Sequence, residues 1–390
     1  MIVTAGSVLT GTASLGAGWV EVDGDRVVAL GSGPAPRPAD LELSNATITP
    51  GFVDMHVHGG GGGAFPEATA SAVAASVALH RRHGTTTMMA SLVSAHPADL
   101  IHQVTVLADH VESGELLGIH LEGPWLSPQR GGAHEPSALR GPDPSEVEAL
   151  LTAGRGTIRM VTIAPELPGA METIRRLSDA GVVAAIGHTD ATYDQARAAI
   201  DAGATVATHL FNAMRPVHHR EPGPVVAALE DPRVTVELIT DGVHLHPALH
   251  RLVTAEVGIE RVALVTDAMA AAGMADGHYT LGSLAVEVVD GVARLAGTET
   301  IAGSTATMAL LVVQAVQHSA ADRDDALLTA VRQVTVNPLR ALGLPAPGLA
   351  PGAPADLVVL SSHLEVTGVL RQGDWLQRPA RSDTDVGVGG

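Results

Sequence analysis

The chain has 390 residues, of which 46% are hydrophobic and only 2% aromatic, so its core must consist mainly of Ala, Val, Leu and Ile. This length fits one large domain with an accessory piece, or two domains. The net charge of -19 argues against a surface that binds nucleic acid or anionic membrane, and the absence of cysteine excludes disulfides, thiolate metal ligands and cysteine nucleophiles.

The two ends of the chain predict β-structure. Short strands are predicted at residues 18–22, 26–30, 41–49, 355–360 and 364–370. Asp23-Gly24 marks a hairpin turn between the first two of these strands. Residues 1–50 and 345–390 are therefore expected to pair into one small β-sandwich domain, and the last residues, 381–390, are expected to be disordered.

Between residues 51 and 344, short apolar strands alternate with Ala-rich segments of helical periodicity. The strands are predicted at 52–57, 85–92, 116–121, 158–163, 182–186, 205–209, 234–239 and 262–266. Helices are predicted at 68–82, 97–112, 144–153, 169–180, 191–202 and 247–258. This alternation predicts an α/β fold, a (β/α)8 TIM-type barrel. A doubly wound open sheet is the alternative, but it usually has fewer strands, and no dinucleotide-binding glycine pattern follows the first strand.

Three further segments follow the eighth strand. A hairpin-like insertion is expected at residues 279–295. Ser304 is expected to cap a helix that runs to about residue 318, and a second helix is expected at 322–334. The N-terminal segment lacks the basic stretch and apolar run of a secretion signal, and no stretch reaches the ~18 apolar residues of a membrane span. We therefore expect a cytoplasmic protein without a membrane or nucleic-acid partner.

Histidine and carboxylate residues gather where the predicted barrel strands end. They are His56, His58, His120, Glu122, His188, Asp190, His209, Asp241, His244 and Asp267. Active sites of (β/α)8 barrels lie at this end of the strands. His56 and His58 are two residues apart on a predicted strand and so face the same way. One such histidine could simply cap a loop, but their accumulation predicts a metal site, for which histidine and carboxylate ligands favour Zn²⁺ or a similar ion.

The sequence around these residues resembles the amidohydrolase superfamily and, within it, the family of N-acetylglucosamine-6-phosphate deacetylases. The matching stretches are Pro50-Gly-Phe-Val-Asp, His120-Leu-Glu-Gly-Pro-Trp, Gly187-His-Thr, Thr208-His-Leu-Phe-Asn-Ala-Met, Arg220-Glu-Pro-Gly, Asp241-Gly-Val-His, Thr266-Asp-Ala and Ile301-Ala-Gly-Ser. They follow one another along the whole predicted barrel. The resemblance implies hydrolysis of N-acetylglucosamine 6-phosphate to glucosamine 6-phosphate and acetate, in amino-sugar catabolism.

The resemblance also implies a ligand set for one or two divalent ions, for which the donor types favour Zn²⁺. Glu122, His188 and His209 form the main site in this family, and His56 with His58 offers ligands for a second ion. Many dinuclear amidohydrolases bridge their metals through a carbamylated lysine. This chain contains no lysine. Glu122 is the natural substitute, which weakens dihydroorotase-like and urease-like alternatives.

Two residues are expected to carry the chemistry. Asp267 is predicted to act as general acid and base, taking the proton of the attacking water and delivering it to the departing amine. His134, by resemblance, contacts the substrate and helps to polarise its carbonyl group. The structural alternatives are a cap at the strand end for Asp267 and a surface-loop histidine for His134.

Further positions are expected to bind the substrate. By resemblance they are Ala133, Asn212, Ala213, Ala302, Gly303 and Ser304, with Arg220 and His244 for the 6-phosphate. An acidic chain needs such dedicated cationic donors for an anion. Asn212 could instead orient its loop, and Ser304 could be only a helix cap. In the family one phosphate contact crosses a subunit interface, which implies a homodimer with the phosphate site near that interface.

Other functions are also compatible with the sequence. The substrate could be another N-acetylhexosamine 6-phosphate, of galacto configuration, because the motifs do not separate the two sugars. The chain could be a different amidohydrolase, an amidase or a deaminase, although Arg220 and the stretch Asn212-Ala-Met argue against this. It could also be a metal-containing sugar-phosphate sensor without turnover, against which the intact Asp267 argues.

Overall fold

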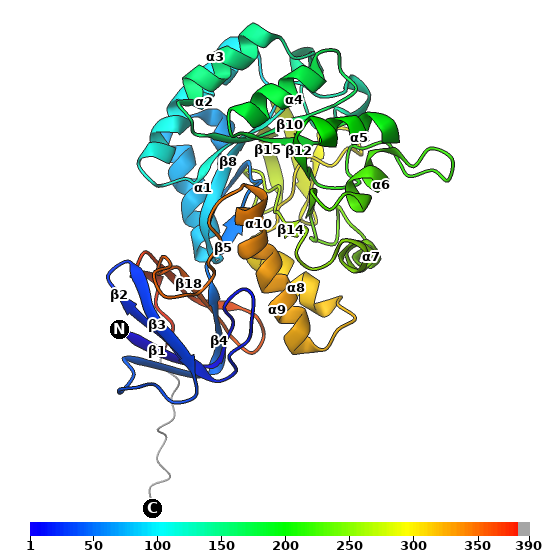
Figure 1. Cartoon of the computed structure of the whole chain (residues 1–390). Coiled ribbons are helices and arrows are strands. Elements are labelled where there is room, and N and C mark those ends of the chain that lie inside the picture. Colours follow the sequence, from blue (N-terminus) through cyan, green and yellow to red (C-terminus); the bar gives the residue numbers. More distant parts are fainter. Residues whose placement is uncertain (381–390) are drawn as a thin grey trace, which may run out of the picture.

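Eight parallel strands form the centre of the fold (Figure 1). A computed structural model describes residues 1–380, so the disorder expected for 381–390 lies outside the described residues. The barrel strands, each hydrogen-bonded to the next, are β5 (Phe52–Asp54), β8 (Thr85–Leu92), β9 (Gly118–Glu122), β10 (Ile158–Ile163), β11 (Val183–Ile186), β12 (Ala204–Ala207), β13 (Thr235–Leu238) and β14 (Val262–Leu264). The predicted (β/α)8 barrel is confirmed.

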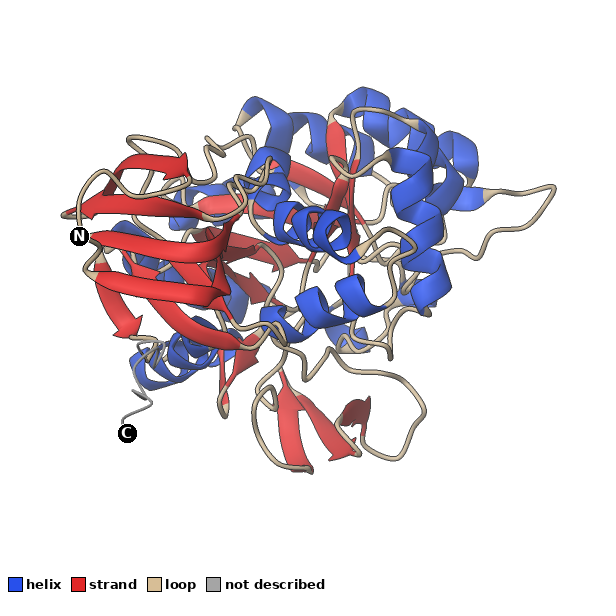
Figure 2. Cartoon of the chain, turned by 90° about the horizontal axis from the view of Figure 1, so that it is seen from below, coloured by secondary structure: helices blue, strands red, loops and turns tan. Residues whose placement is uncertain are grey.

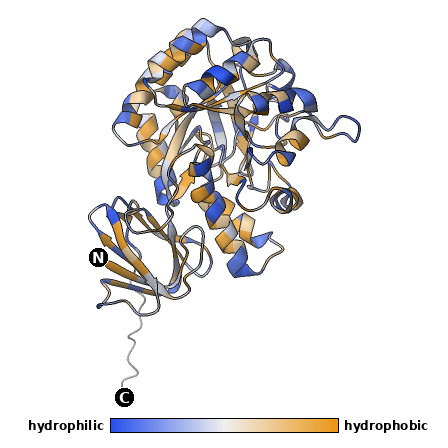
Figure 3. Ribbon diagram, in the orientation of Figure 1, coloured by the Kyte–Doolittle hydropathy of each residue, from blue (hydrophilic) through white to orange (hydrophobic). Residues whose placement is uncertain are grey.

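Helices surround the barrel and carry hydrophobic and hydrophilic faces (Figure 3). They are α1 (Ala70–Arg82), α2 (Pro97–Glu112), α3 (Pro144–Gly154), α4 (Ala170–Asp179), α5 (Tyr193–Ala202), α6 (Gly223–Glu230), α7 (Pro247–Val257), α8 (Met308–Gln317), α9 (Arg323–Val334) and α10 (Val336–Ala341). Side-chain caps begin several of them. Asp143 accepts the backbone N–H groups of Ser145 and Glu146 at α3, and Thr192 begins α5 with a capping box.

The barrel has two apolar layers. Large side chains such as Met55, Met89, Met160 and Ile239 fill its interior, and the short helix α10 contributes to the same cluster. A larger cluster lies between the strands and the surrounding helices. Because the interior is packed with side chains, a ligand cannot enter the barrel itself, and the open rim beyond the carboxyl ends of the strands is where active sites of this fold lie.

The seam between the first and eighth barrel strands has no backbone ladder among the described residues. Contacts just beyond the strands join it instead. The Asp267 N–H donates to the His56 carbonyl at 2.9 Å, and the Thr266 hydroxyl donates to Asp54 Oδ2 at 2.5 Å. Asp54 is fully buried, and burial raises its pKa to about 7. The seam therefore positions two predicted site residues against each other.

Both ends of the chain form one seven-stranded sheet beside the barrel (Figure 1). Its strands are β1 (Ile2–Val8), β2 (Gly18–Asp23), β3 (Arg26–Ser32), β4 (Leu41–Pro50), β18 (Leu357–Leu360), β19 (Val366–Arg371) and β20 (Asp374–Gln377). N-terminal and C-terminal strands meet where β4 pairs with β18, and side chains from both halves share one core. The small β domain built from both ends is confirmed, whereas its boundaries at residues 50 and 345 stay a prediction.

A second, three-stranded sheet is inserted after the barrel strands and projects from the body of the molecule (Figure 2). It consists of β15 (Gly277–Leu281), β16 (Leu284–Val289) and β17 (Val292–Leu295). Its apolar side chains pack with Val93 and Ala133, which belong to loops at the barrel rim. The insertion therefore forms one wall of the space above the strands. Among residues 1–380, none of the helices combines the length and the apolar character that a membrane crossing needs.

Two expected details are wrong. The first barrel strand ends at Asp54, so His56 and His58 lie beyond it, where the backbone turns to bond Ala268 across the seam. Ser304 caps no helix, because its hydroxyl donates to the Thr266 carbonyl at 2.5 Å, and α8 begins only at Met308. Two short helices, α6 and α10, were not predicted. Both contain proline, which is typical of loops as well as of first helical turns.

Asp231, between α6 and β13, offers a test of how the barrel is stabilised. Its buried carboxylate accepts Arg233 at 2.9 and 2.7 Å and Arg197 at 2.8 Å, and chiefly the bonds from Arg233 hold its pKa below the ordinary value. We expect Asp231→Asn to lower the free energy of unfolding at pH 7 by about 1–3 kcal/mol. A depressed folded-state pKa gives stability above the unfolded pKa of ~3.9, so the difference between wild type and variant should shrink as the pH falls below ~4. Urea denaturation at several pH values measures it.

Candidate active site

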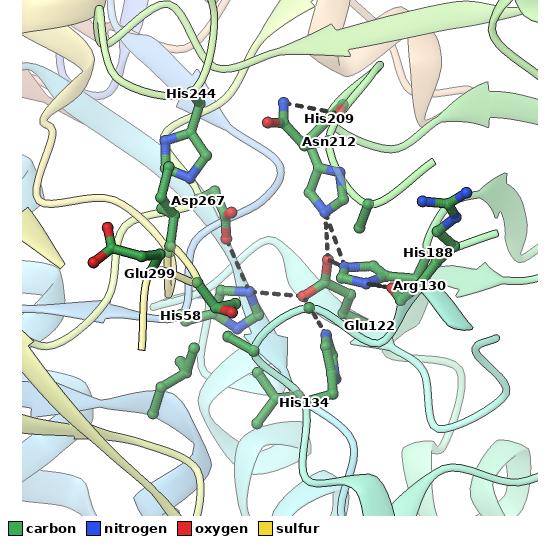
Figure 4. A pocket seen from close by; sticks show the side chains of 18 of the residues that line it. His58, Glu122, Arg130, His134, His188, His209, Asn212, His244, Asp267 and Glu299 are labelled. Atoms are coloured by element: carbon green, nitrogen blue, oxygen red, sulfur yellow. Dashed lines mark hydrogen bonds and ion pairs between the residues drawn. The ribbon is translucent and has the colours of Figure 1, made fainter. Parts of the chain in front are cut away.

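A cavity of about 390 Å³ opens at the rim of the barrel (Figure 4). Eleven of the predicted site residues line it, namely His58, Glu122, Ala133, His134, His188, His209, Asn212, Ala213, His244, Asp267 and Gly303. Glu122 is the last residue of β9, and the others lie on loops that follow six different barrel strands or lie beside the inserted sheet. The cavity is therefore the place where the separate sequence motifs meet.

Glu122, His188 and His209 form the first cluster, on the right of Figure 4. The two histidine Nε2 atoms lie 3.1 Å apart, and Glu122 Oε1 lies 3.0 Å from one and 2.9 Å from the other. All three side chains are buried. Three potential ligand atoms thus converge on one point, which is the arrangement that a divalent metal requires.

His56, His58, Glu122 and Asp267 form a second cluster beside the first. The Nε2 atoms of the two histidines are 3.2 Å apart, and His58 Nε2 lies 3.1 Å from Glu122 Oε2 and 3.2 Å from Asp267 Oδ1. Glu122 belongs to both clusters. Its Oε1 faces His188 and His209, and its Oε2 faces His58. It therefore has the position expected of a carboxylate that bridges two ions in place of a modified lysine.

Hydrogen bonds on the far side of the rings fix how these histidines present their nitrogens. The Nδ1–H of His188 donates to the Arg130 carbonyl at 2.9 Å, and the Nδ1–H of His58 donates to the Ser91 carbonyl at 3.1 Å. A carbonyl can only accept, so in the neutral rings Nε2 carries the free lone pair. Such outer hydrogen bonds are typical of metal-binding histidines. The donors present therefore fit a divalent metal.

Several site residues have left-handed backbone conformations, which side chains other than glycine rarely adopt. The φ angle is 47° at His188, 26° at His209, 51° at Ala213 and 49° at Asp267. Each such residue costs free energy unless its surroundings hold it, and such conformations cluster at functional sites. These strained backbone conformations orient the side chains toward the cavity.

Asp267 is buried, yet it is ionised. Burial opposes its ionisation, but the positive charge of His56 and the hydrogen bond from His58 lower its pKa below the ordinary value. Conversely, burial disfavours a charged His58, while its bonds to Asp267 and Glu122 raise the pKa of His58 to about 9. Protonated His56 and His58 thus balance the buried carboxylates, a cation bound here would replace their protons, and Asp267 is in the basic form that accepts a proton.

His134 faces the cavity as a hydrogen-bond donor. Its Nδ1 accepts the backbone N–H of Ser94 at 3.1 Å, so the ring proton must be on Nε2, which lies 3.4 Å from Glu122 Oε2. Burial lowers the pKa of His134 to about 4, and the ring is neutral at pH 7. The side chain is therefore placed as a neutral N–H donor, the form that can bind a carbonyl oxygen.

The two residues predicted to bind the phosphate, His244 and Arg220, lie apart from each other. His244 lines the cavity, and although burial lowers its pKa, the bond of Nδ1 to Asp241 at 2.7 Å raises it above the ordinary value. Arg220 is exposed, and it lies on the loop before α6 rather than in the cavity of its own chain. Arg130, which sequence reasoning missed, is the arginine that lines the cavity, held by Asp190 through Nε at 2.9 Å and Nη2 at 2.8 Å.

Two of the remaining predicted contacts have a different position. Ala302 and Ser304 are buried behind Gly303 and do not line the cavity. The Ser304 N–H donates to the Asp267 carbonyl at 2.7 Å, so this serine supports the backbone of Asp267. A buried carboxylate on β13, Glu237, also escaped sequence reasoning, although a single acidic residue within the apolar stretch 234–239 was a usable signal.

A (β/α)8 barrel with histidine and carboxylate clusters at its rim defines the class of metal-dependent hydrolases. Comparison with known proteins agrees. Residues 47–376 match the Amidohydrolase family. The chain belongs to this family.

Within this family, the similar proteins include deacetylases of N-acetylated sugar phosphates. An N-acetyl-D-glucosamine-6-phosphate deacetylase from Mycobacterium smegmatis, solved as the D267A mutant in complex with N-acetyl-D-glucosamine-6-phosphate, is 62% identical, with a TM-score of 0.96 over 97% of this chain and 99% of that one. An N-acetylglucosamine-6-phosphate deacetylase from Bacillus subtilis is 33% identical over 92% of both chains. An N-acetylgalactosamine-6-phosphate deacetylase from Escherichia coli O157:H7 is 38% identical over 87% of this chain and 90% of that one.

Proposed function

We propose that the chain hydrolyses the N-acetyl group of N-acetylglucosamine 6-phosphate, giving glucosamine 6-phosphate and acetate in cytoplasmic amino-sugar catabolism. The observation that carries the proposal is the convergence of Glu122, His188, His209 and Asp267 on one cavity. The two deacetylase relatives named for the gluco sugar support this substrate. An ionised Asp267 beside the ligands favours an enzyme over a sensor.

Glu122, His188 and His209 would hold the main ion, and His56 and His58 would add the ligands of a second. Histidine and carboxylate donors favour Zn²⁺. When bound, a divalent metal supplies Lewis-acid activation of water at neutral pH. The protein itself keeps these ligands in place within a buried cluster.

The chain's own residues account for the proton transfers. Asp267 accepts a proton from the attacking water and later gives it to the nitrogen of the departing amine, so that the C–N bond breaks with a neutral leaving group. His134 donates its Nε2–H to the acetyl oxygen, where negative charge develops, and this stabilises the transition state. The walls formed by Ala133, Asn212, Ala213 and Gly303 would orient the sugar.

The phosphate group would lie toward His244. Arg220 of one subunit would reach the cavity of another in a homodimer, because its loop points away from its own barrel (Figure 1). Arg130 offers a further positive charge in the same chain. Together these groups would overcome the acidic character of the whole chain, which repels an anionic substrate.

The proposal is tested by measuring acetate release by the zinc-loaded chain from four sugars, the N-acetylated gluco and galacto compounds with and without the 6-phosphate. We expect the gluco phosphate to have the highest kcat/KM. A faster reaction with the galacto phosphate would favour the alternative substrate, for which the Escherichia coli relative provides the precedent. If none of the four sugars released acetate, the proposal would be overturned.

We expect Arg220→Ala to raise KM for the phosphorylated substrate by about 10–100-fold, because a charge-assisted hydrogen bond contributes ~1.5–3 kcal/mol. kcat should change little, since Arg220 binds a group remote from the reacting bond. The unphosphorylated sugar is the internal control, and its turnover should be the same in wild type and variant. An equal loss for both sugars would mean that Arg220 acts on folding or assembly rather than on the phosphate.

A further inference from the structure

Glu237 is a buried carboxylate beneath the metal-ligand clusters. It lies on β13, within the apolar run Val234–Ile239, and its side chain is fully excluded from solvent. A carboxylate at such a position is costly, because ionised groups lose strong hydration when they are buried. A leucine would suit the barrel interior better if packing were the only demand.

The contacts of Glu237 join ligands of both clusters. Its Oε2 accepts the Nδ1–H of His56 at 3.1 Å and the backbone N–H of His209, also at 3.1 Å. Its Oε1 has no hydrogen-bond partner among the described residues. The carboxylate therefore belongs to no wider structural network, and the interactions it does make are directed at two of the expected metal ligands.

The bond to His56 decides which ring nitrogen is available. A neutral imidazole carries one proton, and a carboxylate at Nδ1 keeps the proton there. Nε2 then presents its lone pair toward His58 Nε2, 3.2 Å away, and toward Glu122. The negative charge of Glu237 also makes the ring a stronger donor. The Nδ1 proton of His58 is held by the Ser91 carbonyl, a neutral group, so of these two histidines only His56 has a charged partner at Nδ1.

We propose that Glu237 is a positioning residue that sets the tautomer and basicity of His56 and so determines the affinity of the second ion, at His56 and His58. The inference rests on the proposed metal centre. Whether the second ion is bound would then depend on this one buried side chain, because the ligand residues alone do not determine it. The second bond, to His209, ties the backbone of a ligand of the first ion to the same carboxylate.

Two variants separate charge from hydrogen bonding. In Glu237→Gln the amide oxygen can still accept both N–H groups, but the charge is lost. In Glu237→Leu both bonds are lost. We expect the affinity for the second Zn²⁺ to fall about 10-fold in the first and about 100-fold in the second, the range typical of outer-shell partners. The affinity for the first ion should be unchanged in Glu237→Gln. Competition with a chromophoric chelator, together with zinc-to-protein ratios after dialysis, measures both affinities without any assay of activity.

Asp231→Asn is the matched control. It removes another buried carboxylate from the segment leading into the same strand, but its partners are arginines remote from the cavity. Both zinc affinities should equal those of wild type, even if stability falls. Circular dichroism of each metal-free variant shows that it is folded before zinc is added. The His58→Ala variant identifies which of the two measured affinities belongs to the second site.

Three results would overturn the inference. One is a Glu237→Leu variant that is folded and binds the second ion as tightly as wild type. Another is an equal loss of both affinities in Glu237→Gln. The third is a wild-type chain that takes up a single ion with an affinity that His58→Ala does not change. Acetate release by the zinc-loaded wild type tests the proposed function separately, because that assay does not depend on the effect of Glu237.

Discussion

Asp267→Asn is expected to lower kcat for acetate release by about 10²–10⁴-fold, the usual contribution of general acid and base catalysis. Asparagine keeps the shape of the side chain but can neither accept the water's proton nor protonate the amine. Because Asp267 lies beside His58 rather than in the wall that binds the sugar, KM should change much less than kcat. Steady-state acetate release over a range of substrate concentrations separates the two constants.

The zinc content of the Asp267→Asn variant is the necessary control. Asp267 Oδ1 lies 3.2 Å from His58 Nε2, so the substitution could also weaken metal binding. With the zinc-to-protein ratio of the first site equal to that of wild type, a large loss of kcat is a loss of proton transfer. A variant with wild-type kcat would refute the assignment of Asp267 as the acid and base.

Glu122→Gln is expected to cause a comparably large loss by another route. Oε1 of Glu122 is close to His188 and His209, and Oε2 is close to His58, so this side chain takes part in both clusters. A neutral amide is a much weaker ligand for a divalent metal. Metal activation contributes several kcal/mol, so kcat/KM should fall by about 10³-fold or more at limiting zinc.

Zinc titration distinguishes this effect from that of Asp267→Asn. Excess zinc should restore part of the activity of Glu122→Gln, whereas the loss of kcat in Asp267→Asn should persist once its first site is filled with zinc. A surface variant, Glu115→Gln, removes a half-buried carboxylate whose partner is His110, far from the rim, and should behave as wild type. If Glu122→Gln retained both its zinc and its activity, the cluster would not be the metal centre.

The barrel could be predicted because its signals are local. Each strand is a short apolar run, and the long helices show their own period, some with a capping side chain such as Asp143 or Thr192. The helix at residues 97–112 was predicted with its exact bounds. The predictions were wrong where a side chain makes a tertiary contact in place of the local contact that its sequence position suggests. Ser304 has the composition of a cap, but its hydroxyl bonds the Thr266 carbonyl, 38 residues away.

The residues of the candidate site also fall into those that local sequence signals predict and those that depend on distant contacts. Strand ends mark the rim, so the sequence located His188, His209 and Asp267, and the structure brings them to one cavity. Arg130 and Glu237 were missed because their significance depends on partners distant in the chain, Asp190 and His56, although the lone acidic residue in an apolar stretch was a local signal for Glu237. The bounds of the first strand were wrong for a physical reason as well. The chain leaves the strand early to close the barrel seam with Ala268.

One measurement tests the central claim most directly. Acetate release from N-acetylglucosamine 6-phosphate is followed with the zinc-loaded chain, then after removal of the metal by chelation and dialysis, then after zinc is restored. The proposed mechanism predicts acetate and amino-sugar phosphate in equal amounts, loss of the reaction in the metal-free chain and recovery with zinc. A zinc-loaded chain that releases no acetate, or a metal-free chain that releases it at the full rate, would contradict it.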